Sequence, residues 1–153
     1  MTESEGQITR NMIARIRRIA GQVRIALEKL DKAAWPSRLQ PHDFPKGYCG
    51  EASLLLAKYL QEQGCGTFGY MTGIYGRDWN HGWLQRDDLV IDITADQFPD
   101  GLEPVIVRRK SSWHNGLGCV EAQYRVADFM DQDDQLSDEL RAVYPKLCEQ
   151  LKR

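Results

Sequence analysis

Hydrophobic residues recur along the chain with two different periods. From residue 6 to 35 they return every three or four positions, which predicts one long or two short amphipathic helices closed by Pro36. A second helix is predicted from about residue 49 to 63, just before Gly64. A last helix is predicted from a cap at Ser137 to about residue 151, kinked or split by Pro145.

The segment between the second and the last helix has the pattern of strands. Short runs rich in aromatic and β-branched residues occupy residues 67–75, 81–86, 89–94 and 104–109, separated by Gly, Asp and Asn. A further strand near residues 121–126 is compatible with the same pattern. Helices followed by consecutive antiparallel strands and a final helix indicate an α+β domain rather than alternating parallel units.

Length and charge narrow the possible classes of protein. With 153 residues we expect a single domain over 1–153, with residues 1–36 as its N-terminal helical segment. A net charge of -2 gives no sign of a nucleic-acid or membrane partner, and neither a membrane span nor a signal peptide is recognisable, so we expect a cytoplasmic protein. The first helix carries the basic residues Arg10, Arg17, Arg18, Arg24 and Lys29. We interpret them as a solvated face, and the alternative is contact with an acidic partner.

The four cysteines do not form a recognisable disulfide or metal pattern. They stand at positions 49, 65, 119 and 148, without paired spacing, so we expect free thiols in a reducing compartment. A zinc site drawn from Cys49, Cys65, His81, His114 and Cys119 lacks the short paired spacing of structural zinc. No metal and no cofactor is therefore expected.

Cys49 stands where a loop gives way to the second helix. The first-turn amides and the helix dipole favour an anion there, so the position favours a thiolate that can attack a carbonyl. The backbone amide of Cys49 would also donate to the oxyanion. The second oxyanion donor remains open, and the candidates are Gln40, His42, Asn80 and Trp83.

A predicted hairpin supplies the other two members of a catalytic triad. With a two-residue loop at 86–87 or 87–88, His81 faces either Asp92 or Thr94, so His81 and Asp92 share one face in both registers. Trp83 and Val90 would lie on that same face and wall the site from water. The residues expected on the opposite face, in the core, are Leu84, Leu89, Ile91 and Ile93.

Each member has a structural explanation of its own, because cysteines are often buried and a lone histidine is usually a satisfied polar group. Cys49 at a helix start, followed by His81 and Asp92 at matching hairpin positions, is a rarer combination. We therefore interpret the three as a Cys-His-Asp catalytic site. His114, in a polar loop, is expected to border the substrate cleft.

Two segments resemble a known superfamily. The runs Phe-Pro-Lys-Gly-Tyr-Cys-Gly-Glu-Ala-Ser at 44–53 and His-Gly-Trp-Leu-Gln-Arg-Asp-Asp-Leu-Val-Ile-Asp-Ile-Thr-Ala-Asp-Gln-Phe at 81–98 resemble the transglutaminase-like branch of the papain-like cysteine enzymes, including small bacterial members of unassigned function. The resemblance implies a catalytic core over 44–98, with the helix of Cys49 packed on a small antiparallel sheet. It departs from the family at Gly50, where an aromatic residue is common nearby, and at Ile93, where the family has proline.

The residues and the resemblance together predict an acyl-transfer enzyme. Cys49 would attack an amide carbonyl, His81 would protonate the leaving amine and Asp92 would orient the imidazole. Hydrolysis is the favoured outcome, as in a cysteine peptidase or amidase acting on a peptide or protein. The alternatives are a protein-glutamine deamidase or transglutaminase-type effector, and a non-catalytic peptide-binding module. The residues expected to contact substrate are Tyr48, Trp83, Gln97 and His114.

Overall fold

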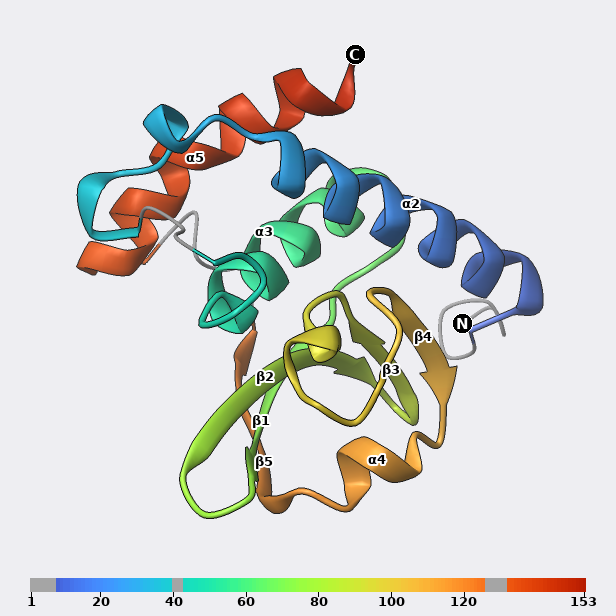
Figure 1. Ribbon diagram of the computed structural model, residues 1–153. Coiled ribbons are helices and arrows are strands. Elements are labelled where there is room, and N and C mark those ends of the chain that lie inside the picture. The colour runs from blue at the N-terminus through green and yellow to red at the C-terminus, as the bar shows by residue number, and fades with distance from the viewer. Residues whose placement is uncertain (1–7, 40–42, 126–131) are drawn as a thin grey trace.

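The computed structural model describes residues 8–39, 43–125 and 132–153 (Figure 1). The helices are α2 (Arg10–Lys29), α3 (Cys49–Glu62), α4 (Ser112–Asn115) and α5 (Gln135–Leu151). The strands are β1 (Gly69–Tyr75), β2 (Trp79–Arg86), β3 (Leu89–Asp92), β4 (Ile106–Arg109) and β5 (Gly118–Arg125). Short 3-10 turns cover Lys32–Ala34, Ser37–Leu39 and Ala95–Gln97. The predicted α+β class is confirmed.

All five strands form one antiparallel sheet in the order β4-β3-β2-β1-β5. The first four strands are the predicted meander. The chain then returns through α4 to the opposite edge, where β5 pairs with β1. In Figure 1 the long helices lie on one side of the sheet and α4 on the other.

Helix α3 is the centre of the fold. Its side chains are buried on almost every face, because it lies between the sheet and the pair α2 and α5 (Figure 1). The core joins apolar residues of these three helices to the inward residues of β2 and β3, which are Leu84, Leu89 and Ile91. This is the face predicted for them by strand alternation.

Two predicted helix ends differ from the observed ones. Helix α2 stops at Lys29 rather than near residue 35, because the extended Leu30 ends it and the Asp31 side chain caps a separate 3-10 turn. Helix α5 is capped by Asp134 rather than Ser137, and it continues through Pro145 to Leu151 without splitting. None of the helices in the described ranges is long and apolar enough to cross a membrane.

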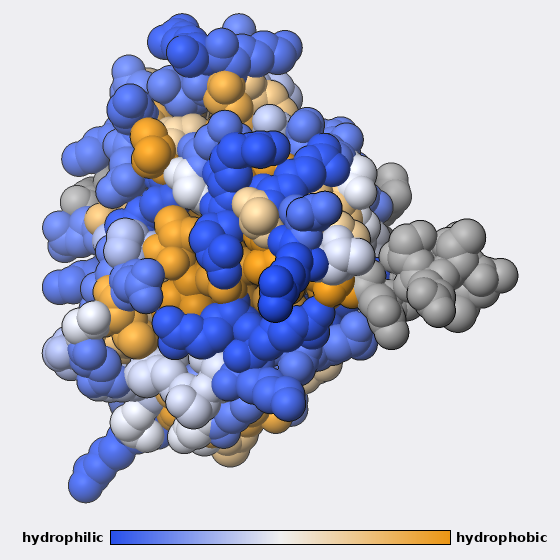
Figure 2. Space-filling model, turned by 90° about the vertical axis from the view of Figure 1, so that its right-hand side faces the viewer, coloured by the Kyte–Doolittle hydropathy of each residue, from blue (hydrophilic) through white to orange (hydrophobic). Residues whose placement is uncertain are grey.

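The basic face of α2 is only partly solvated. The Arg17 side chain donates to the carbonyl of Val107 at 2.8 Å and so covers the free edge of β4. A cavity of about 390 Å³ lies between these elements. Figure 2, which views this side of the molecule, shows apolar surface within hydrophilic surroundings.

Arg24 is buried, contrary to the prediction of a solvated side chain. Its guanidinium makes a bidentate ion pair with Asp96 at 2.8 Å and donates to the carbonyl of Ile93 at 2.7 Å. It also lies 5.2 Å from the centre of the Phe44 ring. Burial is tolerated because the guanidinium is paired and hydrogen-bonded.

Candidate active site

The β2-β3 hairpin has the second of the two predicted registers. Leu84 pairs with Ile91 and Arg86 with Leu89, which leaves Asp87 and Asp88 as the two-residue loop. Asp87 has φ 54°, a left-handed conformation that Asp tolerates better than most residues. His81 and Asp92 consequently share one face of the sheet, as predicted.

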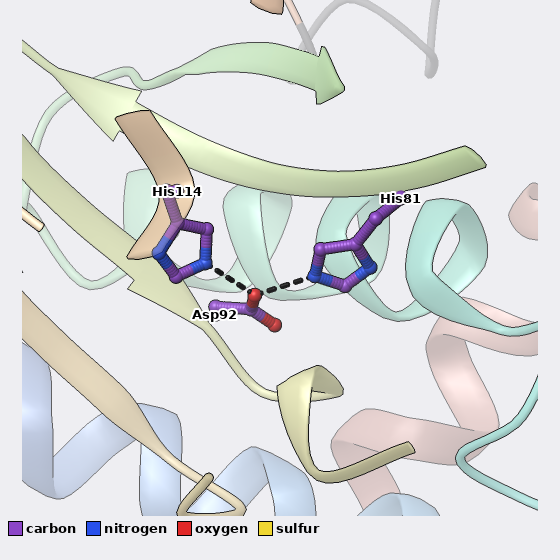
Figure 3. Close-up of side chains that lie close together, drawn as sticks. All are labelled: His81, Asp92 and His114. Carbon is purple, nitrogen blue, oxygen red and sulfur yellow. Dashed lines mark hydrogen bonds and ion pairs between the residues drawn. The ribbon is translucent and has the colours of Figure 1, made fainter. Parts of the chain in front are cut away.

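Asp92 is the centre of a buried hydrogen-bond network (Figure 3). Its Oδ2 accepts from His81 Nε2 at 2.6 Å and from His114 Nε2 at 2.7 Å. Its Oδ1 accepts from the backbone amide of Thr94 at 2.9 Å. All three ionisable side chains are fully buried. Both carboxylate oxygens are therefore held in fixed directions.

The network stabilises the charged forms of Asp92 and His81. Burial opposes a charge on Asp92, yet the nearby His81 and the hydrogen bonds from both histidines hold the pKa of Asp92 well below its usual range. Burial likewise opposes a charge on His81, but the Asp92 carboxylate and then Cys49 raise the pKa of His81 to about 9. His81 is an imidazolium at neutral pH.

Cys49 begins α3, as predicted, and its half-buried side chain lies close enough to His81 to add to the rise of the imidazole pKa. Since Nε2 of His81 is taken by Asp92, the thiol side of the ring is Nδ1. That atom is buried and makes no aligned hydrogen bond to any described residue. It remains the nitrogen with a proton to exchange.

Two glycines, one at the start of α3 and one in β2, leave room for the Tyr70 hydroxyl of β1. A Cβ added at Gly82 would lie 2.0 Å from the Tyr70 hydroxyl oxygen, and one at Gly50 would lie 3.2 Å from the same oxygen. Only glycine leaves room at position 82. At Gly50 a side chain would be a tight fit against the same hydroxyl.

His114 is placed differently from the expectation. Its side chain has no exposed surface and contacts Asp92 rather than bordering a cleft. Ser111 caps α4 and holds the other ring nitrogen, with 2.6 Å between its Oγ and His114 Nδ1. Since the ionised Asp92 only accepts hydrogen bonds, His114 donates through Nε2, and in the neutral ring Nδ1 then accepts from the Ser111 hydroxyl. The sequence pattern singles out this histidine but not its partner.

The other three residues expected to contact substrate lie around the site in supporting positions. Trp83 is fully buried beside His81 and His114, and its indole nitrogen donates to Gln85. Gln97 is buried, accepts from the amide of Gly47 at 3.3 Å and donates to the carbonyl of Thr94 at 3.0 Å. It thus ties the loop before Cys49 to the turn after Asp92.

Tyr48, the third of these residues, precedes Cys49 as the helix cap. Its ring packs against Trp35 and Phe44, and its hydroxyl donates to the carbonyl of Leu39.

Of the candidate oxyanion donors, Gln40 and His42 lie outside the described residues. Asn80 is exposed, and the Trp83 indole is already engaged with Gln85.

Aromatic residues that the sequence pattern does not connect with the site cover His81. The Phe98 and Trp113 rings lie 4.8 and 5.8 Å from the imidazole, centre to centre. Tyr75 and Trp79 continue the cluster toward solvent. The density of aromatic residues near positions 75–83 and 98–113 is the available signal, but their convergence depends on the strand pairing.

His81, Asp92 and His114 also offer ligand atoms within 4.8 Å of one another, which raises the question of a metal. Ligand atoms around one zinc ion, at about 2.1 Å from it, lie about 3 Å or more apart. The nitrogen-oxygen separations of 2.6 and 2.7 Å are those of direct hydrogen bonds instead. The arrangement fits a proton-transfer network better than a metal centre.

Chemically, the site combines a thiol at a helix start, an imidazolium and a buried carboxylate, the set required for nucleophilic attack on a carbonyl. No protein-family model, curated protein or solved structure matches this chain.

Proposed function

We propose that the protein is a thiol-dependent acyl-transfer enzyme that acts on an amide bond of a peptide or protein, on a papain-like fold of the transglutaminase-like type. One observation carries the proposal: the buried His81 binds Asp92 through Nε2 while the Cys49 side chain, at the start of α3, interacts with the same imidazole.

The proposed reaction follows from the proton positions. The Cys49 thiolate attacks the amide carbon, forming the C-S bond, and His81 gives its Nδ1 proton to the nitrogen as the C-N bond breaks. Neutral His81 then takes a proton from water, whose oxygen attacks the thioester carbon. The C-S bond breaks, which releases the acid and restores the Cys49 thiolate and the protonated His81. Asp92 keeps the imidazole oriented in both halves. Hydrolysis is the simplest outcome, since water needs no acceptor site of its own.

Alkylation tests the nucleophile without knowledge of the substrate. The exposed Cys119 serves as an internal reference for an ordinary thiol, and Cys65 and Cys148, whose pKa values are raised by burial, as slow ones. Iodoacetamide at pH 6 should modify Cys49 at least tenfold faster than Cys119, as read by peptide mass, because the imidazolium stabilises the thiolate. His81→Ala should remove most of this advantage. Equal rates for Cys49 and Cys119 in the native protein would falsify the proposal.

Turnover is tested with a peptide library read by mass spectrometry. Native protein should cleave or deamidate some members, and Cys49→Ala should act on none while keeping its circular dichroism spectrum. EDTA should leave the rate unchanged, because the buried network is held by hydrogen bonds. Binding of peptides without any turnover would favour a non-catalytic binding module on the same fold.

A further inference from the structure

A second feature lies beside the proposed site. A cavity of about 440 Å³ opens next to the aromatic cluster, between the end of β1 and the segment from α4 to β5. Tyr75 and Trp113 form aromatic walls, and Ile74 and Leu117 add apolar surface. Among the described residues that line it, Asp100 is the only charged one.

The Asp100 carboxylate is held in place and remains charged. It accepts from Trp113 Nε1 at 2.7 Å on one oxygen and from the Tyr75 hydroxyl at 2.7 Å on the other. These bonds, from Trp113 first and then Tyr75, lower the pKa of Asp100 below its usual value. Each carboxylate oxygen can accept a further hydrogen bond, and the side chain is exposed.

The cavity shares one aromatic residue with the surroundings of the site. The Trp113 ring forms one wall and also lies 5.8 Å from the His81 ring, centre to centre. An extended peptide advances about 3.3–3.6 Å per residue. A substrate side chain near the scissile bond is therefore a candidate occupant of the cavity.

We propose that this cavity binds an arginine or lysine side chain of the peptide substrate, close to the scissile amide. The aliphatic stem would lie on Leu117 and Ile74, and the charged end would meet Asp100 and the faces of Trp113 and Tyr75. An acidic side chain would be repelled by the same carboxylate. The inference rests on the proposed function, because it assigns that site a substrate class.

Matched alkylating reagents test the cavity separately from turnover. Chloroacetyl-agmatine carries a guanidinium on a four-carbon chain, and chloroacetyl-pentylamide is neutral and of similar length. Both form a C-S bond with Cys49 and release chloride. At low salt the cationic reagent should modify Cys49 about three- to tenfold faster, the advantage expected from an exposed ion pair assisted by aromatic faces. In Asp100→Asn the ratio of the two rates should fall to about one, because the carboxylate charge is lost.

Control variants separate the cavity from the general field of the protein. Asp78→Asn removes an equal charge from the exposed β1-β2 turn and should leave the advantage intact. Tyr75→Phe removes one hydrogen bond but keeps the Asp100 charge, so most of the advantage should remain. An advantage that persists in Asp100→Asn, or is absent from the native protein, overturns the inference.

A binding measurement keeps the inference distinct from the proposed function. In Cys49→Ala, Nα-acetyl-arginine methylamide should shift the NMR signal of the Trp113 indole N-H, which is bonded to Asp100. Nα-acetyl-norleucine methylamide should not shift it. If only the arginine compound shifts the signal and Cys49 of the native protein is unreactive, the cavity is supported and the enzyme is contradicted. If both compounds shift the signal equally, the cavity alone is overturned.

Discussion

Asp92 is the residue on which the proposed chemistry depends most. A buried carboxylate is costly unless its lone pairs are used, and here two imidazoles and the Thr94 amide use them. The anion consequently persists and keeps its partner His81 charged. The reactivity of Cys49 thus depends on Asp92, which acts on the thiol through His81.

The charge of His81 should be observable by NMR. Because its folded pKa is raised, to about 9, the ring stays protonated at neutral pH and loses its proton as pH rises through that value. The stability gained from the pair is complete below about pH 6.5 and is lost through the same rise. Asp92→Asn removes the largest favourable charge, so the midpoint of the His81 titration should fall by about one unit or more. A midpoint unchanged in the variant contradicts this assignment.

His114 acts through Asp92 as a positioning residue. Its proton competes with that of His81 for Oδ2. In His114→Ala the oxygen becomes more basic, so the His81 midpoint should rise while turnover falls roughly ten- to a hundredfold, the scale of a hydrogen bond to a charged group. His114→Gln keeps a hydrogen-bond donor and should restore part of the native His81 midpoint and part of the turnover. Asn115→Ala, on the exposed face of α4, is the matched control and should change neither. A purely structural role would lower stability without moving the titration.

At the scale of elements, sequence patterns predict what depends on local geometry. The side-chain period of two and the short loop are enough to place His81 and Asp92 on one face. The same patterns do not predict α4, because a helix of four residues is too short to show a periodicity. The partner of His114 and the supporting role of Gln97 also escape them, because both depend on segments brought together by the fold.

The close approach of the Tyr70 side chain of β1 to the backbone of β2 makes Gly82 a sensitive position. An alanine Cβ would overlap the Tyr70 side chain, so Gly82→Ala should lower the free energy of unfolding by about 1–3 kcal/mol, as for other overpacked sites. Chemical denaturation measures this change. Gly21→Ala is the matched control, because nothing lies within 4 Å of its added Cβ in α2. It should stabilise by about 0.5–1 kcal/mol. A tolerated alanine at 82 would mean that the Tyr70 side chain packs less closely on β2.

At the scale of the whole molecule, Arg24 connects the first helix to both halves of the site. It lies over Phe44 in the loop before Cys49, and it binds Ile93 and Asp96 after Asp92. The first helix therefore supports the candidate site and is not only an addition to the region of residues 44–98.

Removing the Arg24 charge should damage stability and reactivity together. Arg24→Met leaves Asp96 without its partner and should cost about 3–5 kcal/mol in denaturant unfolding. Cys49 alkylation should slow because the loop before Cys49 and the turn after Asp92 lose their common contact. Arg24→Lys should give intermediate stability and an intermediate alkylation rate, because lysine cannot pair bidentately with Asp96. The exposed Arg18→Met, on the same helix, should change neither measurement. If Arg24→Met is less stable but its Cys49 is alkylated at the native rate, the ion pair does not support the reactivity of the site.

The return of the chain through α4 would make the proposed activity depend on a segment that is synthesised after the other site residues. Cys49, His81 and Asp92 all precede β4, but His114 is delivered only by the segment that carries the chain to the other edge of the sheet. A nascent chain that has emerged as far as β4 holds three reactive groups without the fourth that fixes them. In the proposed enzyme, full turnover would therefore await the folding of the segment that carries His114.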